Sequence, residues 1–131
     1  MDPAVSKLVR KRAGNRCEYC LMRQEDEPFF RMQIEHIIAR QHGGGDEASN
    51  LALSCHHCNL HKGPNLSAID PSTSQVVLLF NPRGQSWAEH FFVQGHAIRG
   101  MTPVGRATVK LLAMNAVARV ELRSAAGIKP G

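Results

Sequence analysis

Short blocks of apolar residues follow one another along the chain, and their different spacings predict both helices and strands. Residues 3–13 have helical spacing, with an expected core face made by Val5, Leu8 and Val9. Gly14, directly after this block, is a typical helix end. Basic side chains cover the other face, which suits either solvent or a phosphate backbone.

The next blocks predict two short strands followed by a short helix. Residues 31–38 mix β-branched and polar side chains, as a strand that enters a hairpin does. Residues 40–49 include three consecutive glycines and are expected to form a flexible loop before a second strand at 51–54. The block at 55–62 favours a short helix, which a Gly-Pro pair then stops.

The second half of the chain predicts further strands and then helices. Residues 75–80 are typical of a strand, and the apolar stretches at 91–93 and 97–98 flank a glycine-containing turn, which favours a hairpin. Thr102 is a suitable N-cap ahead of a proline, and apolar residues follow at helical spacing with a break near Asn115. We interpret this half, which has no concentrated chemistry, as a packing extension, with a DNA-facing role as an alternative.

Composition limits the classes of protein that fit. The chain has 131 residues, so we expect a single domain, residues 1–131. Only 43% of the residues are hydrophobic and 5% aromatic, so a bound metal would help to stabilise the fold. The sequence has no run of about 18 apolar residues and no leader-like segment, so we expect a soluble, cytoplasmic protein with no membrane partner. The net charge of +5 favours a polyanionic partner, but charge alone is a weak indication.

Four cysteines form two Cys-x2-Cys pairs, namely Cys17 with Cys20 and Cys55 with Cys58. In a reducing compartment such pairs are better explained as metal ligands than as disulfides, and four thiolates give the closed tetrahedral site of structural zinc. We therefore predict one structural zinc. His56 and His57 are expected to be surface residues, because the four cysteines complete the ligand set. A thiol-redox protein would need one pair free, and the second pair argues against it.

The other candidate chemistry lies in Glu35, His36, Asn50 and Asn59. Each has an ordinary explanation on its own, since a histidine in an apolar run is usually a core residue and an asparagine is usually a turn or surface residue. Neighbouring side chains of a strand point to opposite faces, so Glu35 and His36 need a bend or bulge to share one cleft. Because all four residues lie in one segment clamped by the expected zinc, a shared site is the better interpretation.

These motifs resemble those of the HNH endonuclease family, which has a ββα-metal fold. The resemblance rests on five segments: Cys17-x2-Cys20, Ile34-Glu-His-Ile37, Gly43-Gly44, Asn50-Leu51 and Cys55-x2-Cys58-Asn59-x2-Lys62. It covers residues 5–63 closely, and residues 64–126 resemble an extension of some bacterial members. It implies an α+β fold, in which an HNH nuclease core with a four-cysteine zinc site is followed by a β-hairpin and helical extension.

The resemblance also implies a role for each site residue. His36 would act as the general base that takes a proton from the attacking water. Glu35 and Asn59 would bind one divalent ion, Mg²⁺ or Mn²⁺, because both offer oxygen. Asn50 would hydrogen-bond backbone groups and hold the loop that bears His36. Contacts to nucleic-acid phosphates would come from Arg40, His61 and Lys62.

Two positions depart from the commonest family pattern. Asn59 stands where the family often has histidine, although asparagine also occurs in active members, including the HNH domains of RNA-guided nucleases. Glu35 stands where aspartate is commoner, but it keeps the carboxylate.

The function that follows is metal-dependent hydrolysis of DNA phosphodiester bonds, with duplex DNA bound at low sequence specificity. The alternative is a non-catalytic, zinc-stabilised nucleic-acid-binding module, which explains the cysteines and the charge but leaves the site residues in register by accident. The sequence leaves open whether one strand or both are cut, the oligomeric state and the role of residues 64–126. It also leaves open the biological role, with restriction, mobile-element activity, defence and packaging as candidates.

Overall fold

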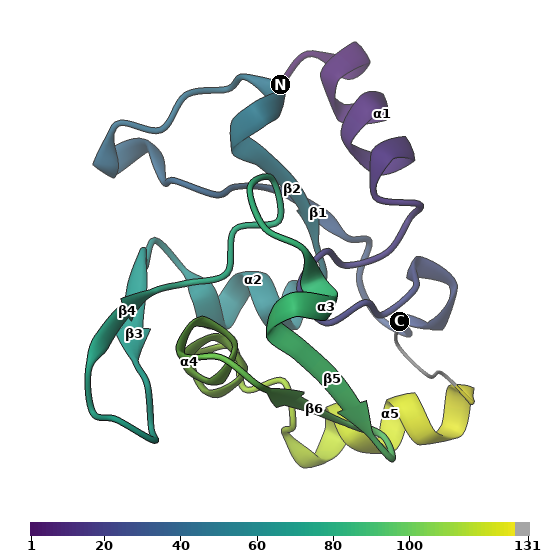
Figure 1. Ribbon diagram of the computed structural model, residues 1–131. Coiled ribbons are helices and arrows are strands. Elements are labelled where there is room, and N and C mark those ends of the chain that lie inside the picture. Colours follow the sequence, from purple (N-terminus) through teal and green to yellow (C-terminus); the bar gives the residue numbers. More distant parts are fainter. Residues whose placement is uncertain (128–131) are drawn as a thin grey trace.

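The computed structural model describes residues 1–127 and has an α+β fold, in which short antiparallel sheets alternate with helices (Figure 1). The α-helices are α1 (Pro3–Arg12), α2 (His56–Lys62), α3 (Trp87–His90), α4 (Pro103–Leu111) and α5 (Val117–Ala126). The strands are β1 (Gln33–His36), β2 (Leu51–Ser54), β3 (Ser67–Ile69), β4 (Val76–Leu78), β5 (Phe91–Gln94) and β6 (Ala97–Gly100). Each strand pairs with its neighbour in the chain, which gives the hairpins β1–β2, β3–β4 and β5–β6. Along the described residues, no helix has the length and apolar character needed to cross a membrane.

The ββα unit that the sequence predicted consists of β1, β2 and α2. The two strands are antiparallel, with Glu35 opposite Ala52. All four residues of β2 are buried, whereas β1 is buried only at Glu35. The helix α2 starts after its N-cap residue, Cys55, and ends at Gly63, whose φ of 53° is positive and suits glycine.

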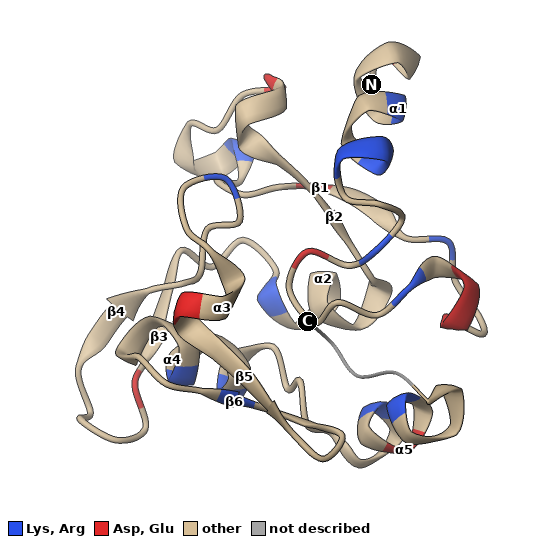
Figure 2. Cartoon of the chain, turned by 45° about the vertical axis from the view of Figure 1, so that its right-hand side comes forward, with Lys and Arg blue, Asp and Glu red and all other residues tan. Residues whose placement is uncertain are grey.

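The N-terminal helix α1 packs against β2. Val9 is fully buried there, but Leu8 is 49% exposed, so the apolar face is narrower than the sequence suggested. The Arg12 guanidinium donates to the backbone oxygens of Ala48 and Leu51, at 3.0 and 2.7 Å, and so ties the helix to the start of β2. Figure 2 shows further basic positions along α1.

Residues 64–127 contain two further hairpins and three helices. The β5–β6 hairpin occupies its predicted place and turns at Gly95, where φ is +64°. The N-cap of α4 is also as predicted, since the hydroxyl of Thr102 accepts the backbone N–H of Gly105 at 3.0 Å. The strand predicted at 75–80 is shorter, and β3 and α3 were missed, because elements of three or four residues carry too little periodicity.

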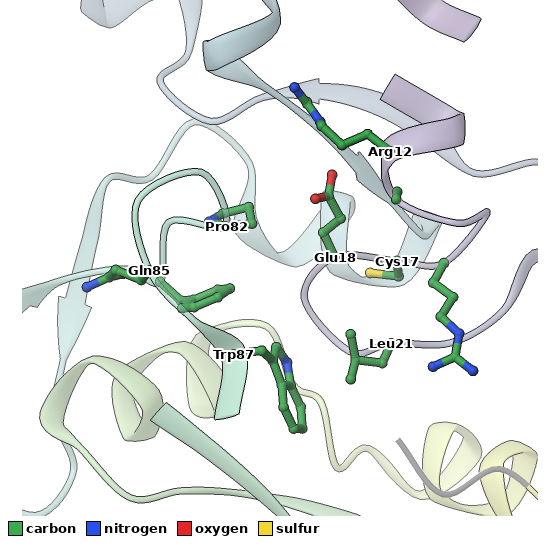
Figure 3. Close-up of a pocket in the computed structure, with 10 residues that line it drawn as sticks. Arg12, Cys17, Glu18, Leu21, Pro82, Gln85 and Trp87 are labelled. Atoms are coloured by element: carbon green, nitrogen blue, oxygen red, sulfur yellow. The ribbon is translucent and has the colours of Figure 1, made fainter. Parts of the chain in front are cut away.

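This extension packs directly onto the segment that carries the cysteines. One core cluster of the described residues joins both parts of the chain and includes Val9, Tyr19, Leu51, Phe80, Phe91 and Leu112. Figure 3 shows the junction, where a pocket of about 230 Å³ is lined from one side by Cys17 and Leu21 and from the other by Pro82 and Trp87. The indole N–H of Trp87 donates to the backbone oxygen of Tyr19 at 2.8 Å, and Arg83 pairs with Glu18. The extension and the ββα unit therefore share one interior.

Candidate active site and metal centre

The sulfurs of Cys17, Cys20, Cys55 and Cys58 lie together in the interior. All four residues are buried free thiols, and their Sγ atoms are within 4.8 Å of one another. The sulfurs of Cys20 and Cys55 are 3.8 Å apart. A tetrahedron with Zn–S bonds of about 2.3 Å has an edge of about 3.8 Å, so the spacing fits zinc. The predicted four-cysteine cluster is thus confirmed, and its donor set suits a structural zinc ion.

The surroundings of the cluster favour a bound cation. Burial raises the pKa of the Cys17 thiol well above its ordinary value, and contact with the other thiols does the same for Cys58. A zinc ion binds thiolates and would supply the positive charge that offsets this cost. The backbone N–H groups of Cys20 and Cys58 also point at the sulfurs of Cys17 and Cys55, at 3.5 and 3.4 Å.

A basic side chain from the last helix also lies beside the cysteine cluster. Arg119 on α5 lies 3.4 Å from the sulfur of Cys55. Its two terminal nitrogens also bind the carboxylate of Glu27, at 3.0 and 3.2 Å. The extension therefore supplies a cation beside the thiolate ligands, which sequence spacing did not reveal.

The two histidines next to Cys55 stay outside the ligand cluster, as predicted. Both histidines are half-buried, however, and each contacts another part of the chain. The ring of His56 stacks on Phe30 with 4.2 Å between centroids, and Nε2 of His57 lies 2.8 Å from the backbone oxygen of Ala113.

The helix α2 crosses the face of β1 that bears Gln33 and Glu35, which are two residues apart and share that face. Asn59 and Lys62 are three residues apart and so project from one side of α2. Asn59 donates its amide N–H to Gln33 at 2.5 Å, and the ammonium of Lys62 lies 3.6 Å from Glu35. Regular strand alternation would turn His36 the other way, but it is the last residue of β1 and lines the same open pocket as Glu35.

Glu35 is a buried carboxylate with a partner at each oxygen. The Tyr19 hydroxyl donates to Oε1, and Lys62 faces Oε2. Desolvation raises the pKa of Glu35, and the nearby Lys62 ammonium opposes this rise. Lys62 is itself only 2% exposed and donates to the backbone oxygen of Ile37 at 3.1 Å. The predicted phosphate contact by Lys62 therefore gains no support from its position, because its ammonium points into the interior.

The His36 ring contacts Asp46, a residue that the sequence predicted only as part of a flexible loop. Its Nε2 lies 2.7 Å from Oδ1 of Asp46. Arg40 donates to both oxygens of the same carboxylate, at 2.8 and 3.1 Å. The hydrogen bond with His36 and the charge of Arg40 lower the pKa of Asp46. A glycine-rich loop gives no local signal of this contact, because the loop must close before Asp46 can meet the strand.

Asn50 holds that loop closed from inside. Its side-chain oxygen accepts the backbone N–H of Ile38 at 2.9 Å, and its amide donates to the backbone oxygens of Ile38 and Gly45 at 3.0 and 2.9 Å. Gly44 lies so close that a Cβ there would fall 1.7 Å from the oxygen of Ile38. Glycine is therefore required at this position, and the backbone that follows His36 is fixed.

An open pocket of about 280 Å³ lies between the end of β1 and α2, lined by Ile34, Glu35, His36, Ala39, Arg40, Asn59, Gly63 and Pro64. It brings together four of the residues singled out from the sequence: Glu35, His36, Arg40 and Asn59. His61 does not line it, because its ring lies against His57 on another side of α2, with 4.2 Å between centroids. The pocket thus combines an imidazole, an amide, a guanidinium and a carboxylate. Such a set of groups can bind a phosphate diester and transfer a proton.

Residues 17–65 match the family model described as HNH endonuclease. Residues 17–65 are an HNH domain. This range contains all four cysteines and every residue that lines the pocket at the end of β1. The four-cysteine cluster and the ββα unit agree with that assignment.

The similarity to a curated protein extends beyond the HNH domain. The chain is 25% identical over 120 residues to the Septu protein PtuB of Bacillus thuringiensis. This match covers 90% of the chain, extension included, but only 44% of that relative, so the chain spans less than half of the relative's length. No solved structure matches the chain.

Proposed function

We propose that this protein is a metal-dependent endonuclease that hydrolyses phosphodiester bonds of DNA. One observation carries the proposal: the pocket that His36 shares with Glu35 and Asn59 lies within the HNH domain and is open to solvent. An HNH domain supports a nuclease-like function, and the imidazole, carboxylate and amide of the pocket support hydrolysis of a phosphate diester as the proposed reaction.

His36 acts as the general base in this proposal. Its side chain is 20% exposed, so a water molecule can reach the ring. Because Nε2 is bound to Asp46, Nδ1 is the nitrogen that accepts the proton of the attacking water. Asn50 supports this base indirectly, since it fixes the backbone of Ile38 two residues further on.

Glu35 and Asn59 fit a hard divalent ion, Mg²⁺ or Mn²⁺. Such ions take one or two protein oxygens and leave the other positions to water and phosphate. The amide of Asn59 bonds Gln33 through nitrogen, which leaves its oxygen for the ion. Glu35 keeps lone pairs beyond those engaged by Tyr19 and Lys62, because a carboxylate has about four acceptor positions. When bound, the ion would neutralise a phosphate oxygen and stabilise the leaving oxygen.

The DNA duplex would lie across this pocket, with Arg40 as a phosphate contact at its rim. The Arg40 side chain is 68% exposed, which suits that role. His61 remains a proposed contact of the neighbouring surface. The chain as a whole, residues 1–131, would act as one domain, with an HNH core at 5–63 and the extension at 64–126; the shared interior supports this organisation.

Cleavage of supercoiled plasmid tests the proposal. The wild-type protein should relax or linearise the plasmid with Mg²⁺ or Mn²⁺ and fail without added metal. His36→Ala should keep the fold and zinc but lose cleavage by about 100-fold or more, and extra metal should not rescue it. Asn59→Ala should be partly rescued by extra metal, and Asn59→His should shift the preference toward transition metals. Cleavage by His36→Ala at the wild-type rate would refute the assignment.

A second function is favoured by a separate observation. Glu35 is only 6% exposed and is bound by Tyr19 and Lys62, an arrangement that also suits a purely structural carboxylate. In that case the protein would be a non-catalytic, zinc-stabilised nucleic-acid-binding module. Binding of DNA by the wild type, with no cleavage under any of the metals above, would favour this function.

A further inference from the structure

We propose that Asp46 is a positioning residue that selects the tautomer and orientation of the His36 ring. The inference rests on the proposed function, because it concerns the base of that reaction. Asp46 belongs to the glycine-rich loop, ten residues after His36 in sequence, and the carboxylate meets the ring at 2.7 Å.

The loop holds Asp46 in place although its side chain is 56% exposed. The residue before it, Gly45, is fixed through its backbone oxygen, which accepts the amide of Asn50 at 2.9 Å. In addition, Arg40 donates hydrogen bonds to both oxygens of the Asp46 carboxylate. The position of the carboxylate is thus determined by a buried asparagine and by an arginine, independently of the histidine that it contacts.

The chemistry of the contact follows from what each group can donate. A carboxylate only accepts hydrogen bonds, so the nitrogen that faces Asp46 must carry the proton. The neutral ring is then the Nε2–H tautomer, and the lone pair is on Nδ1. After Nδ1 has taken a proton from water, the same carboxylate stabilises the positive imidazolium. This is the division of labour known for Asp–His pairs in hydrolases.

A competing role for Asp46 is that of a direct ligand of the divalent ion, because it is an exposed carboxylate near the pocket. The two roles differ in their dependence on metal. A ligand variant recovers when the metal concentration rises, whereas a variant that has lost the orienting bond does not. A third possibility, that Asp46 only shapes the loop, would leave the His36 tautomer unchanged when the carboxylate alone is removed.

The experiment uses the zinc-loaded full chain, with Asp46→Ala, Asp46→Asn and Asp46→Glu compared with the wild type. The matched control is Glu47→Gln, which changes the neighbouring exposed carboxylate of the same loop. Circular dichroism and zinc content first verify that each variant is folded. Nitrogen-15 NMR of His36 without added Mg²⁺ or Mn²⁺ then reports which ring nitrogen carries the proton, and plasmid cleavage gives kcat, KM and the metal concentration for half-maximal rate.

The wild type and Glu47→Gln should show the Nε2–H tautomer. Asp46→Ala should show a mixture, and Asp46→Asn should shift toward Nδ1–H, because an amide can donate to Nε2. The kcat of both variants should fall by about 10-fold or more, with KM and the metal midpoint unchanged and with partial recovery in Asp46→Glu. An unchanged tautomer in Asp46→Ala, or recovery of its activity by extra metal, would overturn the inference.

The two proposals fail in different ways. Absence of cleavage by the wild type would refute the proposed function and with it the catalytic part of this inference. The NMR comparison would still decide whether Asp46 fixes the ring of His36.

Discussion

Arg119 donates to the sulfur of Cys55 across 3.4 Å, although 63 residues lie between them in the chain. This contact joins the last helix to the zinc cluster. A zinc ion with four thiolates has a net charge of about −2, and burying such a charge is costly unless a cation lies beside it. Arg119 supplies that cation, and the carboxylate of Glu27 fixes its orientation.

The first prediction concerns zinc. The purified protein should contain about one zinc per chain, because four thiolates make one closed site. The Arg119→Gln variant should lose zinc to a chromogenic chelator about 10–100-fold faster than the wild type. The reason is that loss of a hydrogen-bond partner of a metal ligand typically lowers metal affinity by about that factor. Arg119→Lys should be intermediate, and the exposed Arg99→Gln on β6 serves as the control. Equal release rates in Arg119→Gln and Arg99→Gln would show that α5 does not support the metal centre.

The second prediction concerns the buried pair of Lys62 and Glu35. Lys62→Met should lower the free energy of unfolding by about 3–5 kcal/mol, because it leaves a buried carboxylate without its cation. The double variant Lys62→Met with Glu35→Gln should recover part of this loss, since no charge is then left unpaired. Urea unfolding of the zinc-loaded proteins measures both values. If the effects of the two single changes simply add, the pair does not interact.

The third prediction concerns acid stability of the extension. Hydrogen bonds from Arg106, Ser72 and Thr73 lower the pKa of the buried Asp70 carboxyl. The folded state therefore binds fewer protons than the unfolded state as the pH falls below about 4, and the stabilisation that is present at neutral pH is lost. Asp70→Asn should be less stable than the wild type at about pH 7, and the difference should narrow by about pH 3.

Urea titrations at both pH values measure this difference, with Glu121→Gln on the exposed face of α5 as the control. Comparison with the wild type at the same pH removes the effect of zinc loss in acid. A difference that stays constant between the two pH values would mean that Asp70 does not carry the acid sensitivity.

The fourth prediction concerns binding to DNA. Affinity should fall steeply with salt and vary little with sequence, because displaced counterions dominate when the contacts are to phosphates. Arg40→Ala should reduce the slope of log affinity against log salt by about 1, whereas Lys110→Gln on α4 should leave it closer to the wild-type value. A footprint confined to one short sequence at physiological salt would contradict this prediction.

The amino-acid sequence by itself determined the features that depend on local spacing. Two residues between paired cysteines suffice to turn both sulfurs toward one ion, so the cluster followed from the sequence. The order strand, strand, helix across residues 31–62 also followed from local patterns, as did the cap of α4 at Thr102.

Only the tertiary structure decided which partner each polar side chain meets. Lys62 was expected at the surface, but α2 lies across β1, so Lys62 faces Glu35 in the interior. Likewise, loop closure brings Asp46 to His36, and docking of α5 brings Arg119 to Cys55. Hydrophobic spacing predicts that a side chain is buried. It does not predict which residues that side chain contacts, because the contacts depend on how separate elements pack together.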